Sequence, residues 1–533
     1  MTTSEMELML NQEQTIIWQN IPYSILEEEM KTMDKVAWQQ EMSEINKLYE
    51  AYKKGMSFYT EGSNGDYLPS RLRFKKAAGI INKEAGFLFG NPPTFTVNPN
   101  VVDEEEMEAT SIIQDLLDEI LKTNAFNDKL LKATKDCFIG KRIAVLINFH
   151  PETGVGITFL DSRSFLYEFA GKGSNKLSRF TAFFNIQENR IKEDQLWFKK
   201  AYTLEDGDVY LLEEMYNGLG ILLKTIFPRQ KIDLKFIPAF IVFNDGLTGE
   251  EKGESELGYI LDYEAVFSKL NNADIDAMRK SMNPTRYAID ASNTSTKNLS
   301  TSPGSFWDIQ SDREILDEGG SAKLGLLEPQ LSYATAIDKT LNRLERAMYD
   351  AVDMPNTSNE AIRGMITSGK ALHAMYWGLA VRCDTKMLSW EPCFDFISHT
   401  IVEGARIYTD VITLYTNQTM LPDIDYVIKI ENNYPLPADE AEEKGIDMGE
   451  VAGQLMSRTS YMKKWREMTD DEIELELEKI KEENDLFENS EMLPETDMSD
   501  FEEGEEEGLG DEDETGIEID EELERIMSVL EGI

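Results

Sequence analysis

A chain of 533 residues is long enough for three to four domains, and its 41% of hydrophobic residues can fill several cores. The longest apolar runs are about five residues, far below the roughly 20 that span a bilayer, so we expect no membrane segment and, without a basic region before an apolar run, no signal peptide. A formal net charge of −47 argues against tight nonspecific DNA binding, because such binding needs cations that displace counterions from phosphates. Three widely spaced cysteines lack a metal-ligand rhythm and predict buried thiols.

The first half of the chain predicts helices followed by an antiparallel sheet. Residues 33–59 and 103–121 have helical patterns, and residues 70–89 predict a basic helix that ends at the Gly-Asn-Pro-Pro of 90–93. Strand-like segments punctuated by Gly, Asn and Asp follow at 94–97, 142–149, 156–160, 165–169, 180–186, 196–202, 209–213 and 236–243. Residues from about 66 to 250 are therefore expected to form one α+β domain.

Two amphipathic helices are predicted around a polar insert. Residues 256–283 and 334–352 carry apolar side chains at three- and four-residue steps, which favours two helices packed antiparallel. The expected packing residues are Ile260, Phe267, Leu270, Ile337, Leu341, Leu344 and Met348. The insert between the helices has strand candidates at 287–290, 306–309 and 313–316, joined by loops rich in Ser, Thr, Gly and Asn. It should form a small lobe at the tip of the helical hairpin.

A polar loop at 353–359 precedes the longest apolar stripe of the chain. Residues 372–408 predict a helix of about 60 Å at 1.5 Å per residue, bent at Pro392. Strands are expected at 411–415 and 425–430, a helix at 439–456, and another helix after a capping box at Thr469 and Glu472. Residues 485–533 contain 21 acidic side chains and one Arg, so the chain beyond residue 489 is expected to be disordered, although 521–530 could form an amphipathic helix.

One segment resembles the phosphate-binding loop of nucleoside triphosphatases. Residues 364–371 read GMITSGKA, so Lys370 is in place, but Ala371 replaces the Ser or Thr whose hydroxyl would hold Mg²⁺. No apolar strand precedes the segment. A structural role is favoured, with Ser368 as a helix N-cap.

The other candidate sites are weaker. Residues 511–522 match the spacing of a calcium loop, but Glu518 stands where such loops carry an apolar residue. His150, His373 and His399 lie far apart and show no triad or metal pattern. The basic cluster at 71–83 has helical spacing, which favours a solvated face. We therefore predict no catalytic residue, no metal site and no cofactor.

The order of these features resembles the portal protein, or head-to-tail connector, of tailed double-stranded DNA bacteriophages, particularly those with long non-contractile tails. The resemblance covers roughly residues 40–490. It rests on LFGNPP at 88–93, the helical hairpin around a small lobe, MP at 354–355 with SGKAL at 368–372, and the stretch from MG at 448 to MKKW at 462–465 before the acidic helix.

The resemblance implies a helix-rich α+β multidomain subunit with an antiparallel-sheet wing, an α-helical hairpin stem, a small α/β clip and a long kinked helix. Its parts would be an N-terminal helical arm (1–65), the wing (66–255), stem helix 1 (256–284), the clip (285–331), stem helix 2 (332–352), a tunnel loop (353–367), the long helix and return strands of the wing (368–434), a helical crown (435–490) and an acidic tail (491–533).

The implied function is structural rather than enzymatic. About twelve copies would form a ring at one capsid vertex, assembled in the host cytoplasm, and double-stranded DNA would pass through the ring during packaging and ejection. Terminase, tail adaptors, and major capsid and scaffold proteins would be its partners, and no membrane would be involved. The channel residues would be Met354, Pro355, Asn356, Thr357, Ser358, Asn359 and Arg363, and the clip contacts would be Tyr287, Phe306 and Trp307.

Two other functions fit parts of the sequence. One is a nucleotide-dependent DNA packaging or processing enzyme that uses residues 364–370, and the other is a structural capsid or scaffold component. ATP hydrolysis that is abolished by Lys370→Ala would identify the enzyme. A closed ring with a central hole would distinguish a portal from a scaffold component.

Overall fold

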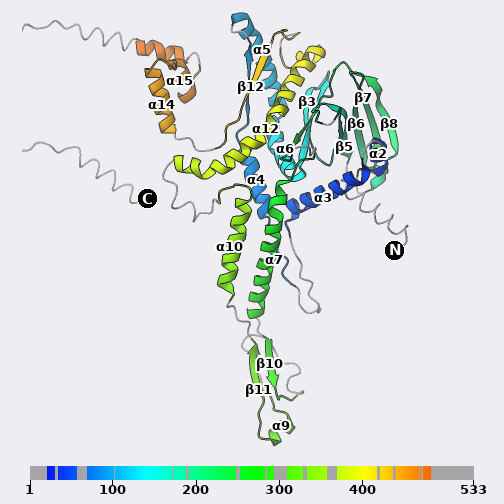
Figure 1. Ribbon diagram of the computed structural model, residues 1–533, viewed down its shortest axis with the longest axis vertical. Coiled ribbons are helices and arrows are strands. Elements are labelled where there is room, and N and C mark those ends of the chain that lie inside the picture. The colour runs from blue at the N-terminus through cyan, green and yellow to red at the C-terminus, as the bar shows by residue number, and fades with distance from the viewer. Residues whose placement is uncertain are drawn as a thin grey trace, which may run out of the picture. The chain divides into compact units, whose positions relative to one another are not determined.

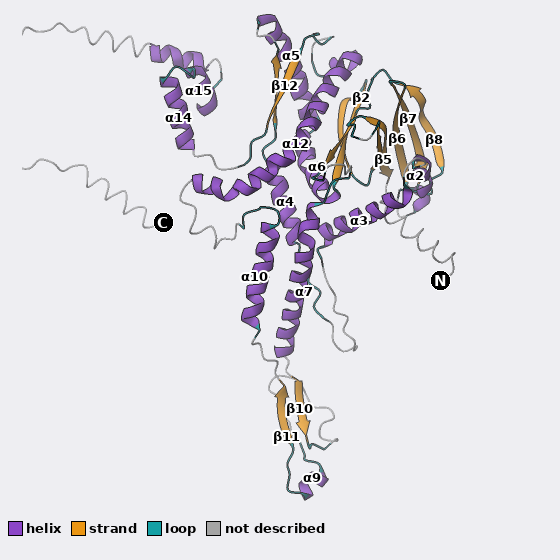
Figure 2. Ribbon diagram, in the orientation of Figure 1, coloured by secondary structure: helices purple, strands orange, loops and turns teal. Residues whose placement is uncertain are grey.

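Helices and antiparallel sheets combine in the computed structural model, as expected for an α+β fold (Figures 1 and 2). The structure describes residues 21–30, 34–56, 69–100, 103–171, 173–187, 191–247, 252–282, 285–292, 309–327, 333–356, 369–416, 420–435, 440–466, 468–469 and 472–481. The chain forms two compact units, Met1–Asp439 and Glu440–Ile533.

The strands of the first unit pair antiparallel throughout. A five-stranded sheet has the order β4 (Phe165–Phe169), β5 (Leu177–Gln187), β6 (Leu196–Glu205), β7 (Asp208–Asn217) and β8 (Leu222–Lys231). A three-stranded sheet places β2 (Arg142–His150) between β3 (Gly154–Asp161) and β9 (Ala239–Phe243). Two further pairs join β1 (Thr94–Pro99) with β12 (Tyr426–Glu431), and β10 (Thr285–Ile289) with β11 (Lys323–Leu327).

The helices of the first unit connect and cover these sheets. They are α2 (Tyr23–Glu29), α3 (Lys35–Lys54), α4 (Lys76–Phe89), α5 (Glu104–Thr123), α6 (Phe126–Gly140), the 3-10 turn η1 (Lys192–Asp194), α7 (Glu256–Met282), α9 (Arg313–Asp317), α10 (Ala334–Asp350), α12 (Gly369–Ile407) and α13 (Thr409–Ile412). Helix α12 has 39 residues and contains Pro392. Figure 1 shows that it is bent, as a proline that removes an amide donor from a helix interior would cause.

Strand β2 lies between two hydrophobic cores because its alternate side chains point to opposite faces. Ile143, Val145 and Ile147 join the larger core, which also contains residues of α4, α6 and α12. Ala144 and Leu146 join a smaller core shared with the five-stranded sheet. All five side chains are buried. This burial on both faces explains why the sequence of β2 is almost continuously apolar.

Helices α2 and α3 are fastened to the sheets by buried ion pairs. Glu41 on α3 lies 2.5 Å from Arg142 on β2, and neither side chain is more than 4% exposed. Glu29 at the end of α2 lies 3.1 Å from Lys199 on β6 in an equally buried position. In each case a carboxylate on the helix pairs with a buried cation on a strand. Because a buried cation needs such a partner, the pair determines the position of the helix on the sheet.

Several details differ from the sequence-based predictions, and strand β11 was not among the strands expected in the insert. The helix expected from residue 70 begins at Lys76, because side chains of α7 hold the preceding backbone extended. Residues 313–316 form helix α9 instead of a strand, with the Asp312 carboxylate accepting the amide of Glu314 at its start. Residues 411–415, also predicted as a strand, contain the last two residues of helix α13, Val411 and Ile412, which are both buried, followed by a turn. Strand β8 was missed because it is exposed on both faces and has no alternating pattern.

The second unit contains a pair of short helices, α14 (Glu440–Ala452) and α15 (Arg458–Arg466), followed by helical residues 472–481. The indole Nε1 of Trp465 donates a hydrogen bond of 2.6 Å to Asp447, and Lys464 lies 2.7 Å from the same carboxylate. The amide of Thr469 donates to the Glu472 carboxylate at 2.9 Å, which is half of the expected capping box.

Candidate functional site

The two helices around the insert lie side by side and run antiparallel, with the β10–β11 hairpin beyond their ends (Figure 1). Of the packing residues expected from the sequence, Ile260, Phe267 and Met348 are buried. Leu341 and Leu344 are partly buried against the main core, whereas Leu270 and Ile337 are half-exposed. Burial is therefore greatest at the end of the pair nearest to α4 and decreases toward the hairpin.

A row of polar side chains on α7 binds the backbone before α4. A carboxylate oxygen of Asp276 accepts the amide of Ser70 at 2.8 Å, and the amide oxygen of Asn272 accepts the amide of Leu72 at 2.9 Å. The side-chain nitrogen of Asn272 also donates to the Leu72 carbonyl at 2.9 Å. Eight residues before Asn272 on α7, Glu264 accepts the amide of Lys76, four residues after Leu72, at 3.1 Å. A helix rises about 6 Å over four residues, and an extended chain rises about 6.6 Å over two residues. Side chains four residues apart on α7 can therefore accept hydrogen bonds from every second amide of the extended segment.

Glu264 acts as the N-terminal cap of α4, because Lys75 at the N-cap position supplies no side-chain hydrogen bond. Burial raises the pKa of Glu264 to about 7, although the amides of Ala77 and Lys76 oppose the shift. The side chain of Lys76 extends to α10, where its Nζ lies 2.6 Å from Glu345. The start of α4 is thus held by both helices of the pair.

Four charged side chains and one amide meet where α4, α7 and α12 converge, and we name them the charge cluster: Glu84, Glu256, Arg382, Lys386 and Asn244. Arg382 donates to Glu84 at 3.2 Å and to Glu256, and Lys386 donates to Glu256 and to Asn244, the latter at 3.0 Å. Glu84 and Glu256 are fully buried. Since two carboxylates face two cations, the cluster joins three helices without leaving a net buried charge.

The two carboxyl groups of the charge cluster have different affinities for protons. Burial raises the pKa of Glu84 to about 7, and the charge of Glu256 adds to the shift. Burial also acts on Glu256, but Lys386 and Arg382 outweigh it and hold the pKa of Glu256 below its usual value. The pKa of Lys386 is raised because the two carboxylates overcome the effect of its burial. Glu84 is therefore the weaker acid of the two carboxyl groups.

Arg382 also connects the charge cluster to the loop that follows α10. Its NH1 lies 3.6 Å from the carboxylate of Asp353, a residue with a left-handed backbone (φ +52°). Next to it, Met354 is buried, and Pro355 and Asn356 are half-buried. The other predicted channel residues, Thr357, Ser358, Asn359 and Arg363, lie outside the described residues. The beginning of the loop is therefore anchored to the same group of helices as the cluster.

A hollow of about 610 Å³ lies beside the charge cluster and is lined in part by Asp245, Asp353, Trp377, Arg382 and Leu388. Trp377 and Leu388 are each 71% exposed. Large apolar side chains on a surface of this kind commonly mark contacts with other proteins.

The predicted clip contacts are only partly described. Tyr287 on β10 is 44% exposed, and its ring occupies the space that a side chain at Gly325 of β11 would need. Phe306 and Trp307 lie outside the described residues.

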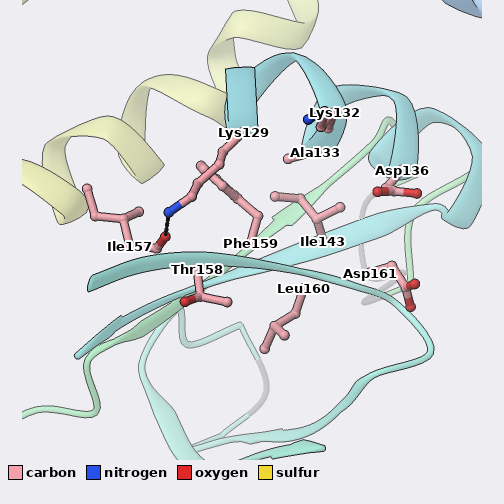
Figure 3. A pocket seen from close by; sticks show the side chains of 10 residues that line it. All are labelled: Lys129, Lys132, Ala133, Asp136, Ile143, Ile157, Thr158, Phe159, Leu160 and Asp161. Atoms are coloured by element: carbon pink, nitrogen blue, oxygen red, sulfur yellow. Dashed lines mark hydrogen bonds between the residues drawn. The ribbon is translucent and has the colours of Figure 1, made fainter. Parts of the chain in front are cut away.

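A second hollow, of about 230 Å³, lies between α6 and β3 (Figure 3). Figure 3 shows Lys129 reaching the Ile157 carbonyl, at 2.8 Å, while Asp136 and Asp161 lie at the other end. Burial raises the pKa of Asp136 to about 6, with Asp161 adding to the shift. Asp136 accepts a hydrogen bond from Tyr49 at 3.0 Å. Because these polar groups have partners inside the protein, the hollow has the character of a packing gap.

Across the described ranges, no three His, Cys, Asp or Glu side chains gather as ligands for a metal ion. Nor does any described helix combine the length and apolar character needed to cross a membrane. Of the phosphate-loop candidate, residues 364–368 are not described, and Gly369 and Lys370 are the first residues of α12.

A family model described as phage portal protein, SPP1 Gp6-like, matches residues 34–486. The chain belongs to this portal family. The family is a structural one, and membership supports a portal role. No curated protein sequence matches the chain. Among solved structures, a chain of the neck of a native GTA particle, computed with C12 symmetry, is similar over 73% of this chain and 88% of that chain, with 8% identity and a TM-score of 0.34. A score of this size does not establish a shared fold.

Sequence reasoning missed the charge cluster, since its members come from positions 84, 244, 256, 382 and 386. A signal was present in two apolar helical stripes. Glu84 stands between Ile81 and Leu88, and Lys386 stands between Cys383 and Trp390. A charged residue on a face that is otherwise buried implies a buried partner, although the sequence does not say which.

Proposed function

We propose that this chain is the portal subunit of a tailed double-stranded DNA phage with a long non-contractile tail. About twelve copies form a ring at one capsid vertex, and the DNA passes through its centre during packaging and ejection. The family match over residues 34–486 carries this proposal. The arrangement of a paired-helix stem with a small hairpin at its tip also supports it.

In this proposal each part of the subunit has a role. Residues 66–255 with 368–434 form the wing, which contacts major capsid and scaffold proteins. The stem comprises 256–284 and 332–352, and the clip at 285–331, with Tyr287, Phe306 and Trp307, receives the terminase and later the tail adaptors. Residues 353–367 form the tunnel loop that approaches DNA, and 435–490 form the crown.

The charge of the chain suits a channel through which DNA must move. At −47 per copy, a ring repels phosphates overall, which favours sliding over tight binding. The polar residues Asn356, Thr357, Ser358 and Asn359, with Arg363, are suited to transient contacts with the passing duplex. No cofactor and no membrane are required for this role.

The position of the chain in the virion tests the proposal against a general capsid or scaffold role. Gold-labelled antibodies against the chain, applied to particles whose tails have been sheared off, should mark a single vertex per particle. Labels at many vertices, or labels absent from mature particles but present on precursors, would contradict a portal function and favour the capsid or scaffold alternative.

A further inference from the structure

Strand β8 forms one edge of the five-stranded sheet and carries an uncovered run of apolar side chains. It pairs with β7, and no described strand pairs with its other edge (Figure 2). Apart from Phe227, every side chain of β8 is exposed. The exposed apolar side chains of β8 and of the turn before it are 42–57% accessible: Leu219, Ile221, Leu222, Leu223 and Ile226. An open strand edge with apolar side chains is a template for pairing with another strand.

The beginning of the described chain lies at the end of the sheet where β8 starts. Gly220, in the turn between β7 and β8, has a left-handed backbone (φ +78°), and its carbonyl accepts a hydrogen bond from the Ser24 hydroxyl at 3.2 Å. A Cβ on Gly220 would lie 2.9 Å from the Cβ of Pro22. Residues 1–20 therefore join the chain beside the start of β8. Twenty extended residues can reach about 66 Å, whereas β8 is only about 33 Å long.

Residues 15–20 of this segment have the composition of a strand. They read Thr-Ile-Ile-Trp-Gln-Asn, and Thr, Ile and Trp are residue types that favour strands. No charged side chain occurs from residue 14 to residue 22, so these residues can cover apolar side chains without burying a carboxylate. The acidic residues of the segment, Glu5, Glu7 and Glu13, all come earlier in the chain.

The contact at Gly220 also sets a direction and a register. A segment that follows β8 from this contact runs backward in sequence while β8 runs forward, so the two are antiparallel. With Pro22 beside Gly220, Trp18 then lies opposite Lys224, and Ile16 lies opposite Ile226. The first would be a cation–π pair and the second an apolar cross-strand pair.

Pro228 limits the length of this pairing. A proline has no amide to donate, which is why prolines within sheets occur on edge strands. The part of β8 before Pro228 is Leu222–Phe227. In the register set at Gly220, these residues lie opposite residues 20 to 15, so the whole strand-like segment finds partners.

The charges of β7 and β8 are compatible with such a cover. Lys224 is the only charged side chain in Leu222–Phe227, and it has no ion-pair partner among the described residues. All other charged side chains of the two strands already form ion pairs: Arg229 with Glu205, Lys231 with Asp208, Glu213 with Lys200 and Glu214 with Lys199. An uncharged strand beside β8 would therefore meet one cation, opposite Trp18.

We propose that residues 15–20 add to the five-stranded sheet of their own chain as a further strand, antiparallel to β8, and cover its apolar side chains. Because the segment is tethered beside β8, its effective concentration there exceeds that of another copy. The added strand replaces the helix that the resemblance implies for this part of the arm. It shields an edge through which copies would otherwise associate. This contact does not depend on the portal role.

Hydrogen–deuterium exchange tests the added strand. Outward amides of residues 222–227 should exchange at least about tenfold more slowly in the full chain than in a chain that lacks residues 2–20. Ile16→Pro with Ile17→Pro should remove this protection, because one of two neighbouring amides faces β8. The matched control, Met9→Pro with Leu10→Pro, lies outside the pairing and should keep it. Equal exchange in the full and shortened chains, or loss of protection in the control, would overturn the proposal.

Cross-linking identifies the copy that supplies the strand. The native cysteines are all buried, so Ile16→Cys and Ile226→Cys in one chain can be joined by a short bismaleimide. The product should be a cross-linked single chain at every protein concentration, formed at least about tenfold faster than with Met9→Cys and Ile226→Cys. Cross-linked pairs of chains would assign the strand to a neighbouring copy. Absence of any product would leave β8 to a different protein, and either result would overturn the proposal.

Discussion

At the scale of single residues, the chain places charges inside its cores and neutralises them there. Arg142 is fully buried, with its guanidinium 5.0 Å from the ring of Trp38 and 5.3 Å from that of Tyr167. Its NH1 donates to Glu41 at 2.5 Å and to the Lys252 carbonyl at 3.0 Å. A pair of this kind stabilises the fold only while both partners remain.

Replacement of Arg142 alone should therefore lower the free energy of unfolding more than replacement of both Arg142 and Glu41. Arg142→Met leaves the buried Glu41 carboxylate with the more distant Lys252, at 3.4 Å, and should lower the free energy of unfolding by about 3–5 kcal/mol. The double variant Glu41→Leu with Arg142→Met should lose distinctly less. Urea unfolding of the parent and both variants would measure these values. A double variant less stable than the single variant would contradict this account.

Glu264 should make stability depend on pH. Its pKa is about 7 in the folded protein, above the 4.5 of a free glutamate. The folded state thus binds the proton more tightly than the unfolded chain. The resulting stabilisation is complete below pH 4.5 and is lost as the pH rises to 7, by up to about 3 kcal/mol. Glu264→Gln should flatten this part of the profile. The free energy of unfolding of both proteins should be measured from pH 4.5 to 8. If it falls with pH as steeply in the variant as in the parent, Glu264 is not the group responsible.

At the scale of elements, α12 approaches the three-stranded sheet through a glycine. A Cβ at Gly404 would overlap the ring of Phe149 on β2, which packs on Tyr408 at 5.5 Å between ring centres. Gly404→Ala should therefore displace this ring and destabilise the protein by about 1–3 kcal/mol.

Gly86 provides the matched control, because a Cβ there would meet no heavy atom within 4 Å. Gly86→Ala, in the interior of α4, should stabilise the protein by about 0.5–1 kcal/mol through helix propensity. Thermal unfolding of both variants would test the contact. Equal effects of the two substitutions would show that α12 and β2 are not packed as described.

Elements with a strong local pattern could be predicted from the sequence, and those set by distant contacts could not. The periodic stretches around Ile260 and Leu341 form the helices α7 and α10 close to their expected bounds. The prediction of a helix at residues 70–75 was wrong, because the amides of Ser70 and Leu72 bind side chains about 200 positions away, which the local pattern does not show. The same holds for the candidate site. The composition of the loop after α10 allowed its position to be predicted, whereas the pairing of Arg382 with buried carboxylates could not be predicted.

At the scale of the whole molecule, the phosphate-loop candidate should be inactive. Ala371 lacks the hydroxyl that would hold Mg²⁺, and Lys370 stands in the first turn of α12. The rate of ATP hydrolysis with the purified chain should therefore equal the rate in buffer alone, and Lys370→Ala should leave this rate unchanged. A colorimetric phosphate-release assay would decide. Hydrolysis that the variant abolishes would support the enzyme alternative.

The central claim concerns the assembled ring. Because each copy carries a charge of −47, assembly should need enough salt to screen the repulsion between copies. The most direct measurement is negative-stain electron microscopy of the purified chain in moderate salt, together with its solution mass. We predict closed rings of about a dozen copies with a central hole wide enough for duplex DNA. Monomers, dimers or open filaments at every salt concentration would contradict the portal assignment.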